Sequence, residues 1–137
     1  MNVLLINSNT VKTPLSQIGL LYLSAYLKMK GVTVNIVDMG APDPAPALES
    51  AARRQPDLVG ISIRNIDSTQ MKLNRYFLPD ALAVVKTVKA RLPGVPVALG
   101  GAGFSLAPLE IMELSGADYG VVGEGERALH ELVLALS

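Results

Sequence analysis

The chain has 137 residues and a mass of 14.5 kDa, enough for one domain with one hydrophobic core and too little for two. Its 12 basic and 12 acidic residues balance and only 4% of its residues are aromatic, which argues against the basic groove or stacking platform that binds nucleic acid. The absence of cysteine excludes disulfides, thiolate metal sites, iron–sulfur clusters and cysteine nucleophiles within this chain.

The N-terminal residues predict a first strand instead of a signal peptide, because residues 1–6 lack the basic segment of a signal peptide. No apolar run reaches the roughly 18 residues that cross a bilayer. We therefore expect a cytoplasmic protein that does not enter a membrane.

Apolar strands and amphipathic helices alternate along the chain. Strands are predicted over residues 2–7, 32–37, 58–63, 95–99 and 117–122. Helices are predicted from a cap at Thr13 with Pro14 to Gly31, over 47–54, over 79–92, over 106–115 with Ser105 as its cap, and after Glu126, with core faces that include Leu20, Leu23, Leu27, Leu129, Leu132, Val133 and Leu136. Residues 67–78 form a connection long enough to be functional or mobile. This alternation predicts an α/β fold in which residues 1–137 form one domain, a five-stranded parallel doubly wound sheet in the flavodoxin-like, Rossmann-like order 2-1-3-4-5.

Residues 58–63 are an unbroken apolar run, as expected of the central strand of such a sheet. Polar residues follow it directly, and ligands of open α/β sheets bind beyond the carboxyl ends of the strands. Small or polar residues also follow the other strands, so the candidate ligand-binding residues are Asn7, Ser8, Asn9, Thr10, Ser62, Arg64, Asn65, Gly100, Gly101, Gly103, Phe104, Gly123, Glu124 and Gly125. For any single loop, the alternative is that glycine serves only a tight turn.

Four common functions of this fold leave different sequence signatures. A phosphate-accepting receiver domain requires aspartate after the third strand, where Ser62 stands, and a dinucleotide site or a P-loop requires glycines that residues 7–10 lack. A flavin mononucleotide remains an alternative, because Ser and Thr in that first loop suit its phosphate.

Four segments together resemble a known family. They are Gly19-Leu20-Leu21-Tyr22-Leu23-Ser24-Ala25-Tyr26-Leu27, Pro56-Asp57-Leu58-Val59-Gly60-Ile61-Ser62, Leu99-Gly100-Gly101 and Ala117-Asp118-Tyr119-Gly120-Val121-Val122-Gly123-Glu124-Gly125-Glu126. In this order, over nearly the whole chain, the pattern resembles the N-terminal cobalamin-binding domain of cobalamin-dependent radical SAM enzymes. Residues 63–67 are similar to the corresponding strand ending in a subset of these enzymes, many of them methyltransferases.

The resemblance implies a cobalamin cofactor whose nucleotide tail has left cobalt. The loop after the first strand lacks the Asp-x-His-x-x-Gly motif that ligates cobalt in the mutase and methionine synthase type, and we expect His130, in the last helix, to face solvent. Because Arg64 leaves the central strand at the floor of the crevice, we expect it near cobalt without coordinating it, and we expect no residue of this chain to be a metal ligand. Ser62 and Asn65 would hydrogen-bond the corrin amides, and Gly100, Gly101 and Gly103 would leave room for the tail base. Alternatively, Arg64 pairs with Asp67 or another carboxylate as a structural bridge.

Radical SAM chemistry requires a Cys-x-x-x-Cys-x-x-Cys motif that this chain does not contain. The resemblance therefore implies that S-adenosylmethionine and a 4Fe-4S cluster belong to a separate catalytic domain, in cis or in trans, and that this chain alone is not catalytic. Glu124 and Glu126 would meet that domain or the cofactor, or simply favour the N-terminus of the last helix. The alternative from another class is a ligand-free interaction or regulatory domain, with residues 67–78 as its docking surface.

Overall fold

A computed structural model describes residues 1–10, 17–65 and 77–137 and contains one five-stranded parallel sheet. The strand order is β2-β1-β3-β4-β5, which confirms the predicted topology. The strands are β1 (Asn2–Asn7), β2 (Thr33–Asp38), β3 (Leu58–Ser62), β4 (Val97–Gly100) and β5 (Tyr119–Gly120). The helices are α1 (Ile18–Met29), α2 (Ala45–Arg53), α3 (Leu78–Arg91), α4 (Ala102–Leu106), α5 (Pro108–Ser115) and α6 (Glu126–Leu136).

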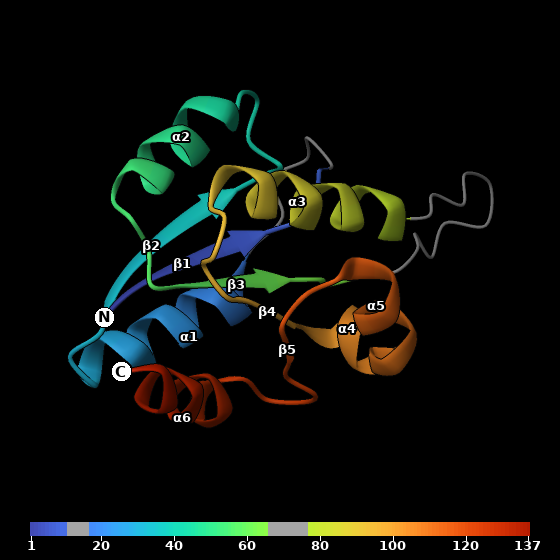
Figure 1. The fold of residues 1–137 in the computed structure, drawn as a ribbon. Helices are drawn as coiled ribbons and strands as arrows, with labels where there is room; N and C mark the ends of the chain where they lie inside the picture. The colour runs from blue at the N-terminus through green and yellow to red at the C-terminus, as the bar shows by residue number, and fades with distance from the viewer. Residues whose placement is uncertain (11–16, 66–76) are drawn as a thin grey trace.

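Helices cover both faces of the sheet, as parallel strands require. Figure 1 shows α2 and α3 on one face and α1 and α6 on the other, with α4 and α5 beside β5. The core is accordingly divided in two, because successive side chains of a strand point to opposite faces. Leu4 and Ile6 of β1 pack on the α3 side, whereas Val3 and Leu5 pack on the side of α1 and α6.

The helix predicted over residues 106–115 is observed as α5, which begins two residues later at Pro108, but the separate short helix α4 before it was not predicted. Ala107 separates them with φ −145° and ψ 60°, a conformation outside the helical region. Pro108 explains the break, since proline has no N–H to donate and disfavours helical geometry in the preceding residue. Ser105 consequently lies inside α4 and is not the cap of a longer helix.

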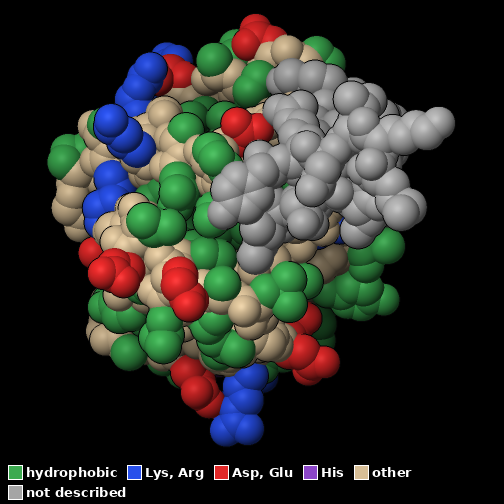
Figure 2. Space-filling model, turned by 90° about the vertical axis from the view of Figure 1, so that its right-hand side faces the viewer, with side chains coloured by type: hydrophobic (Ala, Val, Ile, Leu, Met, Phe, Trp, Pro, Cys, Tyr) green, Lys and Arg blue, Asp and Glu red, His purple; other side chains and the backbone are tan. Residues whose placement is uncertain are grey.

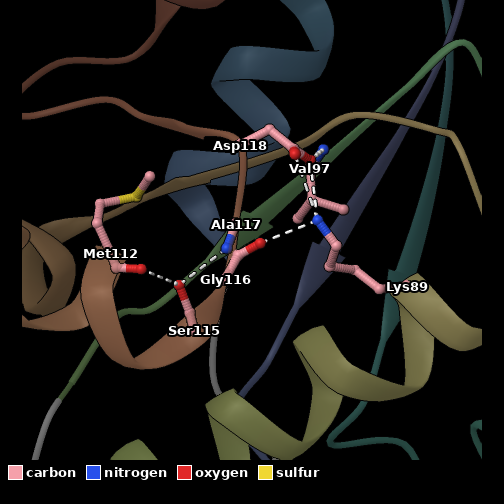
Figure 3. A network of polar contacts seen from close by, with 7 residues as sticks. All are labelled: Lys89, Val97, Met112, Ser115, Gly116, Ala117 and Asp118. Carbon is pink, nitrogen blue, oxygen red and sulfur yellow. Dashed lines mark hydrogen bonds and ion pairs between the residues drawn. The ribbon is translucent and has the colours of Figure 1, made fainter.

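Strand β5 is shorter than the predicted 117–122. Its backbone is hydrogen-bonded to β4 from the N–H of Asp118 to the N–H of Val121, and the chain then turns at Gly123 with φ 79°. A side chain strengthens this edge: the Asp118 carboxylate accepts the N–H of Val97 at 2.8 Å and lies 3.2 Å from Lys89 Nζ (Figure 3). Lys89 also donates to the carbonyl of Gly116 at 2.9 Å, so this network fastens the amino end of β5 to β4 and α3.

The remaining predicted boundaries of β1, β2, α2, β3, α3 and β4 lie within two residues of those observed. In α6, Leu129 and Val133 are buried as predicted, but Leu136 in its last turn is 36% exposed. The predicted cap at Thr13 and Pro14, and most of the predicted long connection, lie outside the described residues. Among the helices that the structure describes, none is long and apolar enough to cross a membrane.

Candidate functional site

Strands β3 and β4 carry unusually small side chains on the face covered by α1 and α6. Gly60 is the register partner of Ala98, and Ser62 is the register partner of Gly100. On the opposite face the same strands carry large buried side chains such as Ile61 and Leu99. Because side chains alternate along a strand, this asymmetry leaves space on one face only.

A cavity of about 260 Å³ occupies that space. It lies between the sheet, α1, the segment after β5 and the start of α6. Its lining residues are Leu5, Gly19, Leu20, Leu23, Gly60, Ile61, Ser62, Ala98, Leu99, Gly100, Gly101, Val121, Gly123, Glu124, Gly125, Glu126 and Leu129.

The cavity has a buried inner end and an exposed outer end. Leu5 and Leu129 are at most 4% exposed, and Gly60 is also buried, whereas Gly123 and Glu124 are exposed. The outer end therefore lies towards the carboxyl ends of the strands, where this fold binds ligands. On this side of the molecule, hydrophobic side chains gather with acidic side chains among them (Figure 2).

The glycines at the cavity differ in what they do. A Cβ at Gly100 would meet only Val121, at 3.6 and 3.8 Å, so the missing side chain leaves room that a ligand can occupy. A Cβ at Gly101 would lie 2.6 Å from the carbonyl oxygen of Ile63, and its φ of 101° favours glycine. Gly101 is therefore required by the turn itself, whereas Gly100 shapes the cavity.

Ser105 joins two walls of the cavity. Its hydroxyl accepts a hydrogen bond from the N–H of Gly123 at 2.9 Å and donates one to the carbonyl of Gly101 at 3.1 Å. The segment after β5 is thus fixed to the end of β4 by one side chain.

Six of the predicted site residues line this cavity, namely Ser62, Gly100, Gly101, Gly123, Glu124 and Gly125. The predicted residues of the loop after β1 do not line it and are hydrogen-bonded elsewhere. Asn7 donates to Asp38 at 2.9 Å and Ser8 donates to the carbonyl of Ser62 at 2.9 Å, which ties the carboxyl ends of β1, β2 and β3 together.

In the same loop, Thr10 donates to Asp80 at the start of α3 at 2.8 Å. The N–H of Asn9 donates to Asn7 Oδ1 at 3.3 Å. These contacts give the loop a structural role whether or not it also meets a ligand.

Four further predicted residues do not line the cavity. Arg64 and Asn65 are exposed and follow the carboxyl end of β3. The N–H groups of Gly103 and Phe104 donate to the carbonyl of Ile63, and the Phe104 side chain is fully buried in the core. The alternative partner of Arg64, Asp67, lies outside the described residues.

His130 is partly buried and does not simply face solvent, contrary to expectation. Its ring meets the ring of Tyr26 edge-on, with centroids 6.1 Å apart. The side chain thus packs between α6 and α1, and it does not line the cavity.

Sequence reasoning missed the part of the cavity that helices and strand interiors provide. Leu20, Leu23 and Leu129 were assigned only to the core, and Gly60 and Ala98 were not assigned to a site. The available signal was a pair of small residues two positions apart in each of two successive buried strands, 60 with 62 and 98 with 100.

The B12 binding domain family profile matches residues 4–133. The chain belongs to the B12 binding domain family. It is 33% identical over 138 residues to tryptophan 2-C-methyltransferase of Streptomyces laurentii, covering 98% of this chain and 23% of that protein.

Two solved structures of a relative share this domain. The radical S-adenosylmethionine methyltransferase TsrM from Kitasatospora setae, with tryptophan and a SAM analogue bound, superposes with a TM-score of 0.89 at 33% identity. The same enzyme with cobalamin and a 4Fe-4S cluster bound gives 0.85 at 31% identity. Both matches cover 98% of this chain and 25% or 24% of TsrM, so the chain spans about a quarter of the length of these relatives.

A response regulator from Thermotoga maritima also superposes, with a TM-score of 0.64 at 17% identity over 98% of this chain and 95% of its own. At that identity the likeness concerns the fold alone. The B12 binding domain thus shares its flavodoxin-like framework with receiver domains.

Proposed function

We propose that this domain binds cobalamin with its nucleotide tail detached from cobalt, as the cofactor-carrying module of a radical SAM methyltransferase-like enzyme. The observation that carries this proposal is the cavity between the small residues of β3 and β4 and the helices α1 and α6. It begins at the carboxyl ends of the strands and runs inward between layers, as a site for the tail of a larger ligand requires.

The lining of the cavity suits a largely apolar group. Leu5, Leu20, Leu23, Ala98 and Leu129 supply hydrocarbon surface, and Gly100 leaves the space of a missing side chain. If about 250 Å² of apolar ligand surface were buried, roughly 25 cal/mol per Å² gives about 6 kcal/mol before ordering costs. Tight binding is therefore compatible with the absence of a protein ligand on cobalt.

Ser62 supplies the specific polar contact in this proposal. Of the described residues that line the cavity, Ser62 alone carries a hydroxyl. It sits on the cavity floor opposite Gly100 in the sheet register. Because it lines the cavity, we assign Ser62 to the tail base instead of the corrin amides expected from the sequence; the ring nitrogen of that base is free to accept a hydrogen bond once it has left cobalt.

Arg64 and Asn65 are proposed to face the corrin from beyond the end of β3. Asn65 has an amide that can donate and accept, which suits the amide side chains of the corrin ring. The guanidinium of Arg64 keeps its charge and has no lone pair to give a metal, so it would lie beneath cobalt without binding it. His130 packs against Tyr26 away from the cavity, and this supports binding without a histidine ligand.

When bound, cobalamin supplies a cobalt centre that accepts and releases a methyl group. The radical SAM part, with its own cluster and S-adenosylmethionine, is proposed to lie outside this chain, either in the same polypeptide or in a partner. The absence of cysteine from residues 1–137 supports this division, because the three-cysteine cluster motif needs another stretch of protein. Glu124 and Glu126 at the outer end of the cavity are then placed to meet the corrin amides or that partner.

The experiment is a titration of the purified chain with hydroxocobalamin, followed by desalting and visible absorbance. We expect roughly equimolar retained corrinoid with the spectrum of the base-off form. Retention with a base-on spectrum would contradict the detached tail. Loss of all colour on desalting would contradict the proposed function, and a parallel titration with flavin mononucleotide tests the other predicted occupant.

A further inference from the structure

Several backbone groups of the cavity wall are hydrogen-bonded within the protein. The carbonyl of Gly100 accepts the N–H of Ile63 at 2.8 Å, and that of Leu99 accepts the N–H of Val121 at 2.8 Å. Both carbonyls belong to lining residues of β4. Because strand carbonyls point along the sheet towards the neighbouring strand, they are not directed into the cavity.

Two backbone groups of the segment after β5 and the start of α6 are also hydrogen-bonded within the protein. The N–H of Gly123 donates to Ser105, and the carbonyl of Gly125 accepts the N–H of Leu129 at 2.8 Å. The carbonyl of Gly101 already accepts two hydrogen bonds from Ser105. On this side, these particular groups are therefore engaged within the protein, while the first N–H groups of α6, which has no side-chain cap, belong to the outer end of the cavity.

The side chains divide the cavity by depth. At the buried end the lining is Leu5, Gly60, Ala98 and Leu129, which have no side-chain donor or acceptor. The carboxylates of Glu124 and Glu126 belong to the segment at the exposed outer end. Ser62 is the neutral polar side chain between these ends, so a group that reaches the bottom leaves water and meets hydrocarbon.

On the basis of the proposed function, we propose that this cavity selects the chemical class of the tail base, favouring a benzimidazole over a purine. The base is the terminal group of the tail, so a tail that enters from the strand ends places its base deepest. A benzimidazole joined to ribose retains one ring nitrogen with a lone pair, which the Ser62 hydroxyl can match, and presents a hydrocarbon edge to Leu5 and Leu129. A purine carries additional ring nitrogens, and adenine an exocyclic amine, which would be buried without partners at this depth.

The test compares the affinity of the chain for cobalamin, for its adenine-containing counterpart pseudocobalamin, and for cobinamide, which lacks the tail. The titrations are followed by visible absorbance under strictly reducing conditions in the cob(I) state. In that state neither base is bound to cobalt. The measured affinities therefore do not include the free energy of detaching the base from cobalt, which differs between the two cofactors. We expect cobalamin to bind at least about tenfold more tightly than pseudocobalamin, the factor that corresponds to one unpaired buried polar group.

A matched pair of variants tests the buried end of the cavity directly. Ala98→Ser adds a hydroxyl at the buried end of the cavity and should reduce the preference for cobalamin over pseudocobalamin. Ala81→Ser adds the same hydroxyl at an equally buried position, in α3 on the other face of the sheet, and should leave that preference unchanged.

The outcomes separate the inference from the proposed function on which it rests. Equal affinities for cobalamin and pseudocobalamin, both tighter than for cobinamide, would overturn base selection and leave the cavity as a tail site. Equal affinities for cobalamin and cobinamide would show that the tail lies elsewhere, which overturns both the base selection and the proposed placement. Absence of binding by all three would overturn the proposed function itself.

Discussion

The hydroxyl of Ser105 accepts a hydrogen bond from the backbone N–H of Gly123, with 2.9 Å between oxygen and nitrogen. The same hydroxyl donates to the carbonyl of Gly101, and both glycines line the cavity. A side chain that does not itself line the cavity therefore sets the spacing of two of its walls. Because Ser105 lies in α4, this short helix helps to shape the cavity through that side chain.

Ser105→Ala is expected to weaken corrinoid binding several-fold, because the segment around Gly123 loses the hydrogen bond that fixes it to β4. The free energy of unfolding should fall by about 1 kcal/mol, the usual contribution of such a bond. Ser115→Ala is the matched control, since its hydroxyl similarly links the carbonyl of Met112 (3.3 Å) to the N–H of Ala117 (3.2 Å) away from the cavity lining. Urea unfolding and absorbance titration of both variants check this, and an equal loss of affinity in Ser115→Ala would show that the effect is global.

Gly100→Leu should abolish retention of corrinoid while the domain stays folded. The backbone at Gly100 has room for a Cβ, whose nearest neighbour would be Val121 at 3.6 Å, so a larger side chain extends into the cavity and occupies the space proposed for the tail. Gly100→Ala should have an intermediate effect on affinity and slightly raise stability, because glycine in a strand is entropically costly.

Gly101→Ala provides the contrast to these variants. Its Cβ would lie 2.6 Å from the carbonyl oxygen of Ile63 at a φ of 101°, so we expect a loss of stability larger than about 1 kcal/mol. Urea denaturation distinguishes the destabilised Gly101→Ala from the Gly100 variants, which should stay folded. Equimolar corrinoid still retained by folded Gly100→Leu would show that the tail does not use this cavity.

The order of the sheet was predictable because each strand can be recognised from its own local sequence pattern. Residues 58–63 are apolar throughout, and the spacing of Leu20 and Leu27 is that of a helix face, so periodicity alone identified most elements. The break between α4 and α5 could also have been predicted, since Pro108 lies inside the predicted helix.

The cavity was less predictable because it depends on register. Gly60 faces Ala98, and Ser62 faces Gly100, only because β3 and β4 pair in one particular alignment across a long connection. A sequence shows that each residue is small, but it does not show that the small residues are neighbours on one face. The loop after β1 was predicted as part of the site because its side chains are polar. In the structure, the side chains of Asn7 and Ser8 are hydrogen-bonded within the protein.

The network at the amino end of β5 predicts different effects for its two charged residues. Asp118→Ala should lower the free energy of unfolding by about 1 to 2 kcal/mol, because the N–H of Val97 loses its acceptor at 2.8 Å. Lys89→Met should cost less than about 1 kcal/mol, since the side chains of this ion pair are 38% and 42% exposed. Asp118→Asn keeps an oxygen acceptor and serves as the control. Urea unfolding of the three variants checks the order, and a larger loss for Lys89→Met than for Asp118→Ala would contradict it.

Arg64→Ala should change the electronic properties of bound cobalamin more than the amount bound. Under the proposed function the guanidinium lies beneath cobalt, where a fixed positive charge favours the reduced, more electron-rich metal. Its removal should lower the cob(II)/cob(I) potential by tens of millivolts, about the size of a screened interaction between charges several ångströms apart. Arg64→Lys keeps the charge on a flexible stem and should retain part of the effect, whereas Arg53→Ala, an exposed arginine at the end of α2, should retain the wild-type potential. Spectroelectrochemical titration of equimolar complexes measures this, and an Arg64→Ala complex with unaltered spectrum and potential would remove Arg64 from the face of cobalt and favour its alternative as a structural bridge.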